Sequence, residues 1–513
     1  MRDVLTMNTV FFVINKYFNP ILFLLIISIS IIIASTRDSI HMSHLHINPP
    51  DEDISLNELL VTPTHPGRTD NTLDHGRCAA LHNKLVEYAW VAEGRHISDL
   101  RRRSFFEYYG DQANEIRERL DSTLVTFLES IVVAEDLPPF FFWVEGISSP
   151  AFMSFYSDTL SDRFVVLYNT YPGFVGHAVG LIYDQQLHRA TMALGIEDID
   201  FTQPVESHGE LWHPLETILS NWWHMIQIGK ITASRDSAPN EKHGPWIWHS
   251  YSPAQVTSAV ASFERLSKAI EDRIPPDKLL PVSDEPLLSH AELDEASVPN
   301  PCFIRSFLTS IRRPRFDRIA PGLVIPHDPV VFAANQRYTT IDVRSEYGPT
   351  IPPVLIFASA ERQTVGLAPI NRYTSINPFC VKFHQYMPSN DQLVLSGLYS
   401  ESVERCSVDN AEEGFRLLLP FPFRASGEED GARKSDMDLV QAKSVADLFQ
   451  HGFKPFGGEW WRAQRLERLF DHWAYLVESG IWKVRENGIE GDINTFREAD
   501  RGRWADYRIA PSW

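Results

Sequence analysis

The chain has 513 residues, of which 43% are hydrophobic and 22% charged, and its formal net charge at neutral pH is −20. This composition excludes an intrinsically disordered chain, and the length allows about two to four domains with sizeable cores. The acidic balance disfavours a surface that attracts nucleic-acid phosphates, so no nucleic-acid partner is expected.

An uncharged stretch near the start, Tyr17 to Ser35, is long enough to cross the apolar core of a bilayer as one helix. We therefore predict a single-pass membrane protein, with residues 1–36 as its hydrophobic N-terminal segment. Two alternatives stay open: a cleaved signal sequence ending near Ala34, or translation from Met42, which would give a cytoplasmic protein. The chain has no Asn-x-Ser/Thr glycosylation acceptor, which favours a body that faces the cytosol.

The first folded part is predicted to follow a linker. Residues 37–75 are rich in proline and aspartate without a sustained period, so they are predicted to be that linker. Residues 76–273 are then predicted to form an α+β domain. Apolar residues recur at helical spacing over 78–93 and 111–134, and Leu137-Pro138-Pro139 is expected to end the second helix.

Strands are expected next, because β-branched and aromatic residues gather in short runs. The expected strands are Phe140–Trp143, Arg163–Tyr168, His177–Tyr183 and Arg189–Leu194, the last two as an antiparallel hairpin. Ser252-Pro253 is typical of a helix start, and that helix is expected to run to about Asp272.

The composition changes after this helix. Prolines among acidic residues mark 274–301 as a linker, and 302–425 contain short alternating segments between turn residues, which predicts a β-rich domain. Its expected strands are Tyr338–Val343, Val354–Phe357, Phe379–Phe383 and Gln392–Leu395. A third linker at 426–441 precedes a helical, tryptophan-rich C-terminal unit at 442–513. Its main helix has an apolar face from Trp461 to Val477 and Gly480 as a fitting C-cap.

These patterns together predict an α+β fold with mixed helices, antiparallel strands, a β-rich middle segment and a helical C-terminus. The blocks Gly458–Trp461, Gly491–Ala499 and Ala510–Trp513 carry a family resemblance. In these last 60 or so residues the chain resembles uncharacterised proteins of filamentous fungi. The resemblance implies no activity.

The four cysteines, Cys78, Cys302, Cys380 and Cys406, are far apart and include no Cys-x-x-Cys pair. This spacing argues against a zinc finger and against a disulfide framework. A single bridge between Cys380 and Cys406 stays open for an oxidising compartment.

The enzymatic hypothesis pairs Cys78, as a nucleophile, with His177 as its base. Cys78 opens a predicted helix, where the positive end of the helix dipole would lower the thiol pKa, and His177 opens a predicted strand. The arrangement resembles papain-like hydrolases, with Asp198 or Asp200 as a candidate to orient the imidazole. The competing interpretation is a half-buried structural cysteine at a helix start and an ordinary strand histidine.

Other chemistry is not indicated by the motifs. His208 and His213 are five residues apart, which does not place both on one helical face as a zinc pair requires. The glycines fit no dinucleotide or phosphate loop, and no Gly-x-Ser-x-Gly occurs. We therefore predict neither a metal site nor a cofactor.

The function that best fits these patterns is binding rather than catalysis. We expect a non-catalytic binding or scaffold protein that is tethered to a membrane and takes an unknown protein or small-molecule partner. The tryptophan pairs Trp222-Trp223 and Trp246/Trp248 are candidates to line an apolar pocket, although such residues more often belong to a core. The alternative is the Cys78–His177 thiol hydrolase.

Overall fold

The computed structural model describes residues 54–136, 139–154, 162–172, 177–199, 204–236, 242–341, 349–367, 378–379, 393–405, 409–423, 430–459 and 461–513. The predicted membrane segment Tyr17–Ser35 lies outside these ranges, as do Cys380 and Cys406. Within the same ranges no helix has the length and apolar character needed to cross a membrane.

Capping side chains set the limits of the first helices. α3 (Ile54–Leu59) lies inside the predicted linker, and α4 (His75–Ala92) confirms the helix predicted over 78–93. The predicted helix over 111–134 is instead divided into α6 (Asp111–Ile116), a 3-10 turn η2 (Arg117–Arg119) and α7 (Ser122–Ser130). The division falls at Asp121, because its carboxylate accepts hydrogen bonds from the first backbone N–H groups of α7 and so starts a new helix.

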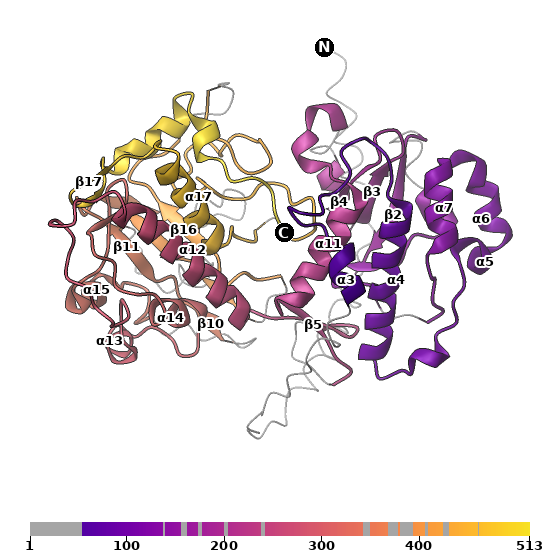
Figure 1. Cartoon of the computed structure of the whole chain (residues 1–513), viewed down its shortest axis with the longest axis horizontal. Helices are drawn as coiled ribbons and strands as arrows, with labels where there is room; N and C mark the ends of the chain where they lie inside the picture. The colour runs from indigo at the N-terminus through magenta and orange to yellow at the C-terminus, as the bar shows by residue number, and fades with distance from the viewer. Residues whose placement is uncertain are drawn as a thin grey trace, which may run out of the picture. The chain divides into compact units, whose positions relative to one another are not determined.

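A four-stranded antiparallel sheet follows, in the order β1-β2-β3-β4. Its strands are β1 (Val144–Ile147), β2 (Phe164–Thr170), β3 (Ala178–Asp184) and β4 (Arg189–Gly195), and β3 and β4 form the predicted hairpin. The strand expected at Phe140–Trp143 is wrong, because these buried aromatic residues form a turn in which Phe141 pairs with Val144. Figure 1 shows α4 and α11 (Leu215–Gln227) beside this sheet.

A seven-stranded sheet is built from the later residues, in the order β16-β14-β11-β9-β8-β18-β17. The strands are β8 (Arg318–Ala320), β9 (Leu323–Val324), β11 (Leu355–Ser359), β14 (Gly397–Ser400), β16 (Phe415–Leu418), β17 (Val484–Arg485) and β18 (Gly488–Ile489). The C-terminal unit thus completes the sheet, since β18 pairs in parallel with β8.

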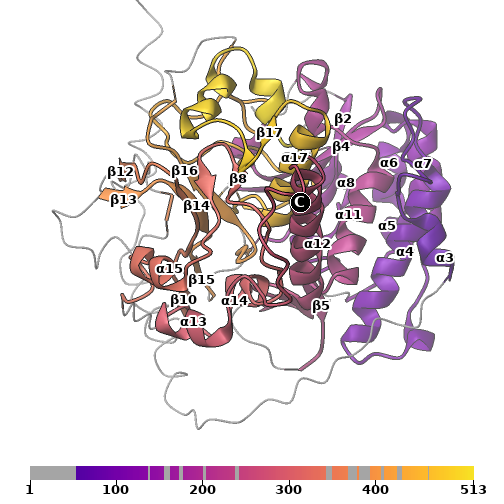
Figure 2. The ribbon, with the colours of Figure 1, turned by 60° about the vertical axis from the view of Figure 1, so that its left-hand side comes forward.

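Two long helices cover this second sheet (Figures 1 and 2). α12 (Pro253–Glu271) begins at the predicted Ser252 cap, and α17 (Leu466–Glu478) lies against it. Phe263 of α12 and Phe470 of α17 both contact Phe357 of β11, with ring centroids 6.2 and 6.4 Å away. The helix predicted at the end of the first domain therefore packs with the helix predicted in the C-terminal unit.

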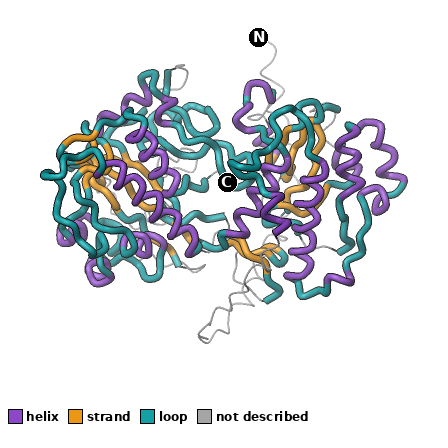
Figure 3. Tube along the Cα trace, viewed as in Figure 1, coloured by secondary structure: helices purple, strands orange, loops and turns teal. Residues whose placement is uncertain are grey.

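The remaining elements are short and alternate with long loops (Figure 3). They are α5 (Phe105–Tyr109), α8 (Pro150–Met153), α13 (His290–Glu295), α14 (Phe303–Leu308), α15 (Pro329–Asn335), the strand sets β5 (Ile231–Ala233), β6 (Lys242–His243) and β7 (Trp246–Trp248), β10 (Thr350–Ile351) and β15 (Val403–Glu404), β12 (Thr364–Gly366) and β13 (Leu393–Leu395), and the 3-10 turns η1 (Ile97–Asp99), η3 (Ile196–Asp198), η4 (Val205–Ser207), η5 (Gly209–Leu211), η6 (Ile493–Asp500) and η7 (Trp504–Tyr507). The strand expected at Tyr338–Val343 is wrong for residues 338–341, which form a turn with Tyr338 buried.

Two large hydrophobic cores hold these layers. The first core draws on residues from Leu60 to Trp248 and adds Phe456 and Trp513 from the C-terminal unit. The second core runs from Ala259 to Ile509 and includes Leu287 and Leu288 from the predicted linker. Helices and largely antiparallel sheets contribute to both, which confirms the α+β class.

Candidate functional site

Cys78 lies in the first core, where it is fully buried on α4. Its Sγ is 3.7 Å from Oε2 of Glu216, a residue of α11. Burial and the neighbouring Glu216 carboxylate raise the thiol pKa well above its ordinary value. The expected lowering of this pKa by the helix dipole is therefore wrong, because desolvation and a like charge outweigh the dipole.

His177 lies in a different environment, directly before β3. Its side chain is 74% exposed, and its Nδ1 is 3.4 Å from Oε1 of Glu197. No contact joins His177 to Cys78 among the residues that the structure describes. Of the two candidate orienting residues, Asp198 accepts a hydrogen bond from the backbone N–H of Gly195, and Asp200 lies outside the described residues. The structure thus does not assemble the papain-like arrangement.

The histidine and tryptophan candidates are parts of the framework. His208 bonds the backbone carbonyl of Pro204. The His213 ring is tilted against Phe456 with centroids 4.6 Å apart, and burial lowers its pKa to about 4. In the described ranges no group of three or more His, Cys, Asp or Glu residues could hold a metal ion. The indole N–H groups of the four candidate tryptophans donate to backbone carbonyls: Trp222 to Phe456, Trp223 to Leu81, Trp246 to Pro139 and Trp248 to Asn410.

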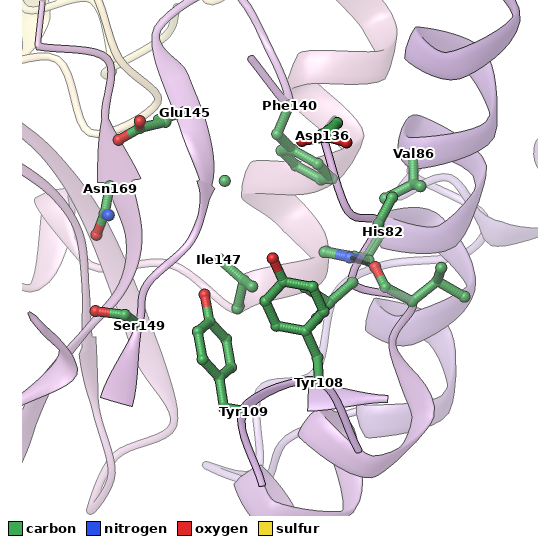
Figure 4. A pocket seen from close by; sticks show the side chains of 14 residues that line it. His82, Val86, Tyr108, Tyr109, Asp136, Phe140, Glu145, Ile147, Ser149 and Asn169 are labelled. Atoms are coloured by element: carbon green, nitrogen blue, oxygen red, sulfur yellow. Dashed lines mark hydrogen bonds between the residues drawn. The ribbon is translucent and has the colours of Figure 1, made fainter. Parts of the chain in front are cut away.

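A pocket of about 290 Å³ lies elsewhere in this half of the chain, between α4, α5 and β1 (Figure 4). We call it the tyrosine pocket. Its walls come from α4, from α5, from the segment before the aromatic turn, and from β1 and β2. The lining residues are His82, Val86, Tyr108, Tyr109, Val132, Val133, Ala134, Asp136, Phe140, Glu145, Gly146, Ile147, Ser149 and Asn169.

His82 forms the inner wall and is held in one orientation. Its Nε2 donates to the backbone carbonyl of Val132 at 3.0 Å, so its Nδ1 accepts from the Tyr168 hydroxyl at 2.9 Å. The imidazole stacks on Phe140 with centroids 4.7 Å apart. Burial lowers the pKa of His82 to about 4, so the ring is neutral near pH 7. Both nitrogens are engaged, which makes His82 a support for the pocket rather than a base.

Tyr108 and Tyr109 form a corner at the end of α5. The helix is started by a capping box, in which Ser104 accepts from the backbone N–H of Glu107 and Glu107 accepts from that of Ser104. The two tyrosine rings lie 4.8 Å apart with an interplanar angle of 79°. Figure 4 shows both hydroxyls directed into the pocket, and neither bonds to any part of the described chain. Burial, together with Tyr108 and Glu145, raises the pKa of Tyr109.

Two carboxylates and one amide complete the polar lining. Asp136 and Glu145 are exposed at the pocket rim, and neither side chain has a hydrogen bond or ion pair with a described residue. The Ser148 hydroxyl donates to Oδ1 of Asn169 at 2.5 Å, which leaves the Asn169 amide nitrogen available as a donor. The pocket therefore presents several polar groups that have no partner among the residues that the structure describes.

A second cavity, of about 340 Å³, lies between α15 and β11, and the polar side chains that line it have partners within the protein. Its His327 bonds the carbonyl of Phe316, and Asp328 caps α15. Arg362 donates to Asn335, while the Gln336 amide bonds both the N–H and the carbonyl of Leu355. Its principal polar side chains are thus occupied within the protein. The tyrosine pocket is the better candidate because its tyrosine hydroxyls and carboxylates have no hydrogen-bond partner among the described residues.

No pattern noted in the sequence indicated the tyrosine pocket. The Ser104-x-x-Glu107 pattern indicates a helix start, and Gly110 after Tyr109 indicates its end, so the short helix could have been found. Asp136, Glu145 and Asn169 join it only through the fold, since no spacing in the sequence relates them to α5.

Comparisons with known proteins found no match for this chain. No family model matches the chain. No curated protein and no solved structure matches it either.

Proposed function

We propose that this chain is a non-catalytic binding protein whose tyrosine pocket takes a small-molecule ligand. The observation that carries the proposal is the set of polar groups around the pocket that have no described partner in the protein, namely the hydroxyls of Tyr108 and Tyr109 and the carboxylates of Asp136 and Glu145. Ligand sites typically combine an apolar enclosure with a few such convergent groups. The volume of about 290 Å³ suits a small ligand.

Binding is favoured over thiol hydrolysis by the chemistry of the candidate residues. Cys78 is buried beside a carboxylate that opposes formation of the thiolate. His82 uses both ring nitrogens in the framework. Ser149 contributes a hydroxyl to the pocket lining. This hydroxyl accepts a hydrogen bond from the backbone N–H of Phe152 as the N-cap of α8, and no imidazole lies beside it among the described residues.

The proposal is tested by filling the pocket. Ala134 lines it and is partly buried, so Ala134→Trp would occupy the space. The matched control is Val331→Trp, which places the same ring in the second cavity. A thermal-shift screen of small neutral, cationic and anionic compounds should yield ligands that stabilise the wild type and the control but not Ala134→Trp. Equal stabilisation of all three proteins would contradict the proposal.

We further propose that Tyr17–Ser35 tethers this binding unit to a membrane, because that uncharged stretch matches the thickness of a bilayer core. Alkaline carbonate extraction of membranes tests the tether. The full chain should stay in the pellet, whereas a variant translated from Met42 should be released. Release of the full chain would rule out the tether and leave the pocket unaffected.

A further inference from the structure

We propose that the ligand of the tyrosine pocket is a small organic amine in its ammonium form. The inference rests on the proposed binding function and names the class of ligand. It follows from the charge, the aromatic geometry and the hydrogen-bonding capacity of the lining.

The charge of the lining is one-sided. Among the lining residues are two carboxylates, Asp136 and Glu145, and neither a lysine nor an arginine. The Arg103 guanidinium lies 5.6 Å from the Tyr108 ring centroid, and its charge is paired with Glu135 at 2.6 Å. His82 is uncharged near neutral pH. A cation entering the pocket is therefore attracted, and an anion is repelled.

The aromatic walls suit the same charge. Tyr108 and Tyr109 both line the pocket, with their ring planes 79° apart and their hydroxyls directed into it (Figure 4). The faces of aromatic rings carry negative electrostatic potential and attract organic cations. Contact between the ligand and either ring face would add to the attraction of the carboxylates.

Hydrogen bonding favours an ammonium group over a quaternary ion. The tyrosine hydroxyls and the carboxylates can each accept a hydrogen bond from an N–H donor, and none of them has a hydrogen-bond partner among the described residues. A quaternary ion has no N–H to offer. Val86, Val132 and Ile147 provide an apolar wall for a short aliphatic body. A metal ion is a poorer fit, because no described group of three His, Cys, Asp or Glu residues could hold one.

The test compares four probes of similar size by calorimetric titration: n-butylammonium, tetramethylammonium, n-butanol and n-butyrate. We expect n-butylammonium to bind at least about tenfold more tightly than each of the others, and its affinity to fall as salt screens the carboxylates.

Glu145→Gln should weaken n-butylammonium binding by about five- to tenfold and leave n-butanol binding unaffected. Glu129→Gln, on α7 outside the lining, makes the same change in charge and should alter neither.

Two outcomes separate the ligand class from the binding function. If n-butanol or n-butyrate binds as tightly as n-butylammonium and Ala134→Trp removes that binding, the pocket is a binding site but the ammonium inference is wrong. If tetramethylammonium equals n-butylammonium, the preference for N–H donors is wrong. If Ala134→Trp changes the binding of no probe, the proposed function itself is contradicted.

Discussion

His82 shows how one residue can couple the pocket to the stability of the first core. The imidazole is buried between Phe140 and Tyr168, with both nitrogens hydrogen-bonded in the neutral form. Protonation would remove the acceptor that Nδ1 offers to the Tyr168 hydroxyl and place a charge in an apolar site. The inner wall of the pocket is therefore stable only while His82 is neutral.

Acidification should consequently destabilise the protein. The pKa of His82 is about 4 in the folded chain, below the ordinary value of 6.5, so the unfolded state binds more protons between these values and stability falls as the pH drops through that window. Between pH 7 and pH 5 the contribution is about 2 kcal/mol. Urea denaturation at both pH values should show a loss about 2 kcal/mol smaller in His82→Gln than in the wild type. An equal loss in the two proteins would show that His82 is not buried in the neutral form.

Cys78 should be inert in the folded protein. Its side chain is fully buried and its pKa is raised, so iodoacetamide should modify it only after unfolding. Peptide mapping by mass spectrometry after alkylation at pH 8, with and without urea, measures this directly. Rapid modification of Cys78 in the native state would contradict the structure and revive the thiol hydrolase.

The sequence predicted the helix that carries Cys78 but not the environment of its thiol. Asp74 before an apolar helical pattern is a local signal, and α4 begins beside it. Glu216, which raises the thiol pKa, lies 138 residues later in the chain. Periodicity cannot reveal such a contact, because it depends on how α4 and α11 pack.

At the scale of elements, prediction succeeded where caps and periodicity agreed. The Ser252-Pro253 start and the apolar pattern after it correspond to α12, and the alternating segments around 177–194 correspond to the β3–β4 hairpin. It failed over 111–134, where one apolar stripe hid the second cap at Asp121. It also failed at Phe140–Trp143. A turn made of buried aromatic residues has the same composition as a buried strand, so composition alone does not separate the two.

The short helix α5 should be the element on which ligand binding most depends. Its five residues, Phe105–Tyr109, hold both tyrosines, and its start relies on the reciprocal bonds of Ser104 and Glu107. Ser104→Ala should lower the free energy of unfolding by about 1 kcal/mol and also weaken n-butylammonium binding, because the tyrosine corner loses its support.

Ser122→Ala is the matched control for that change. Ser122 is the first residue of α7, and the cap of that helix is Asp121. Urea denaturation and calorimetric titration should show little effect of Ser122→Ala on either quantity. If Ser104→Ala also left the free energy of unfolding and the affinity for n-butylammonium unchanged, α5 would not be positioned by its capping box.

At the scale of the whole described unit, buried charges connect the two large cores. Lys230, beside the first core, donates to Glu413 at 2.9 Å and to the backbone carbonyls of Ser250 and Asn410. The Arg462 guanidinium bonds Asp409 at 2.7 Å, and it lies 5.4 Å from the Trp248 ring centroid. Residues 409–413 lead into β16 of the second sheet.

Removing one member of the Lys230–Glu413 pair should be costly. Burial lowers the pKa of Lys230 while Glu413 opposes that shift, so each charge depends on the other. Lys230→Met would leave the buried Glu413 carboxylate without its cationic partner, with only the hydrogen bond from Gln255 remaining among the described residues, and should cost about 3–5 kcal/mol in the free energy of unfolding. The double variant Lys230→Met/Glu413→Gln should recover part of this loss. A single variant within about 1 kcal/mol of the wild type would show that the pair does not link the cores.

The most direct measurement of the central claim is a nuclear magnetic resonance titration of protein labelled with carbon-13 at the tyrosine ring carbon that bears the hydroxyl. Tyr108→Phe and Tyr109→Phe assign the two pocket signals. If an ammonium group binds in the tyrosine pocket, n-butylammonium should shift both signals to saturation, and n-butanol at the same concentration should shift them far less. The signal of Tyr475, which is exposed on α17, should not respond. Pocket signals that stay fixed in n-butylammonium, or that move equally with n-butanol, would contradict it.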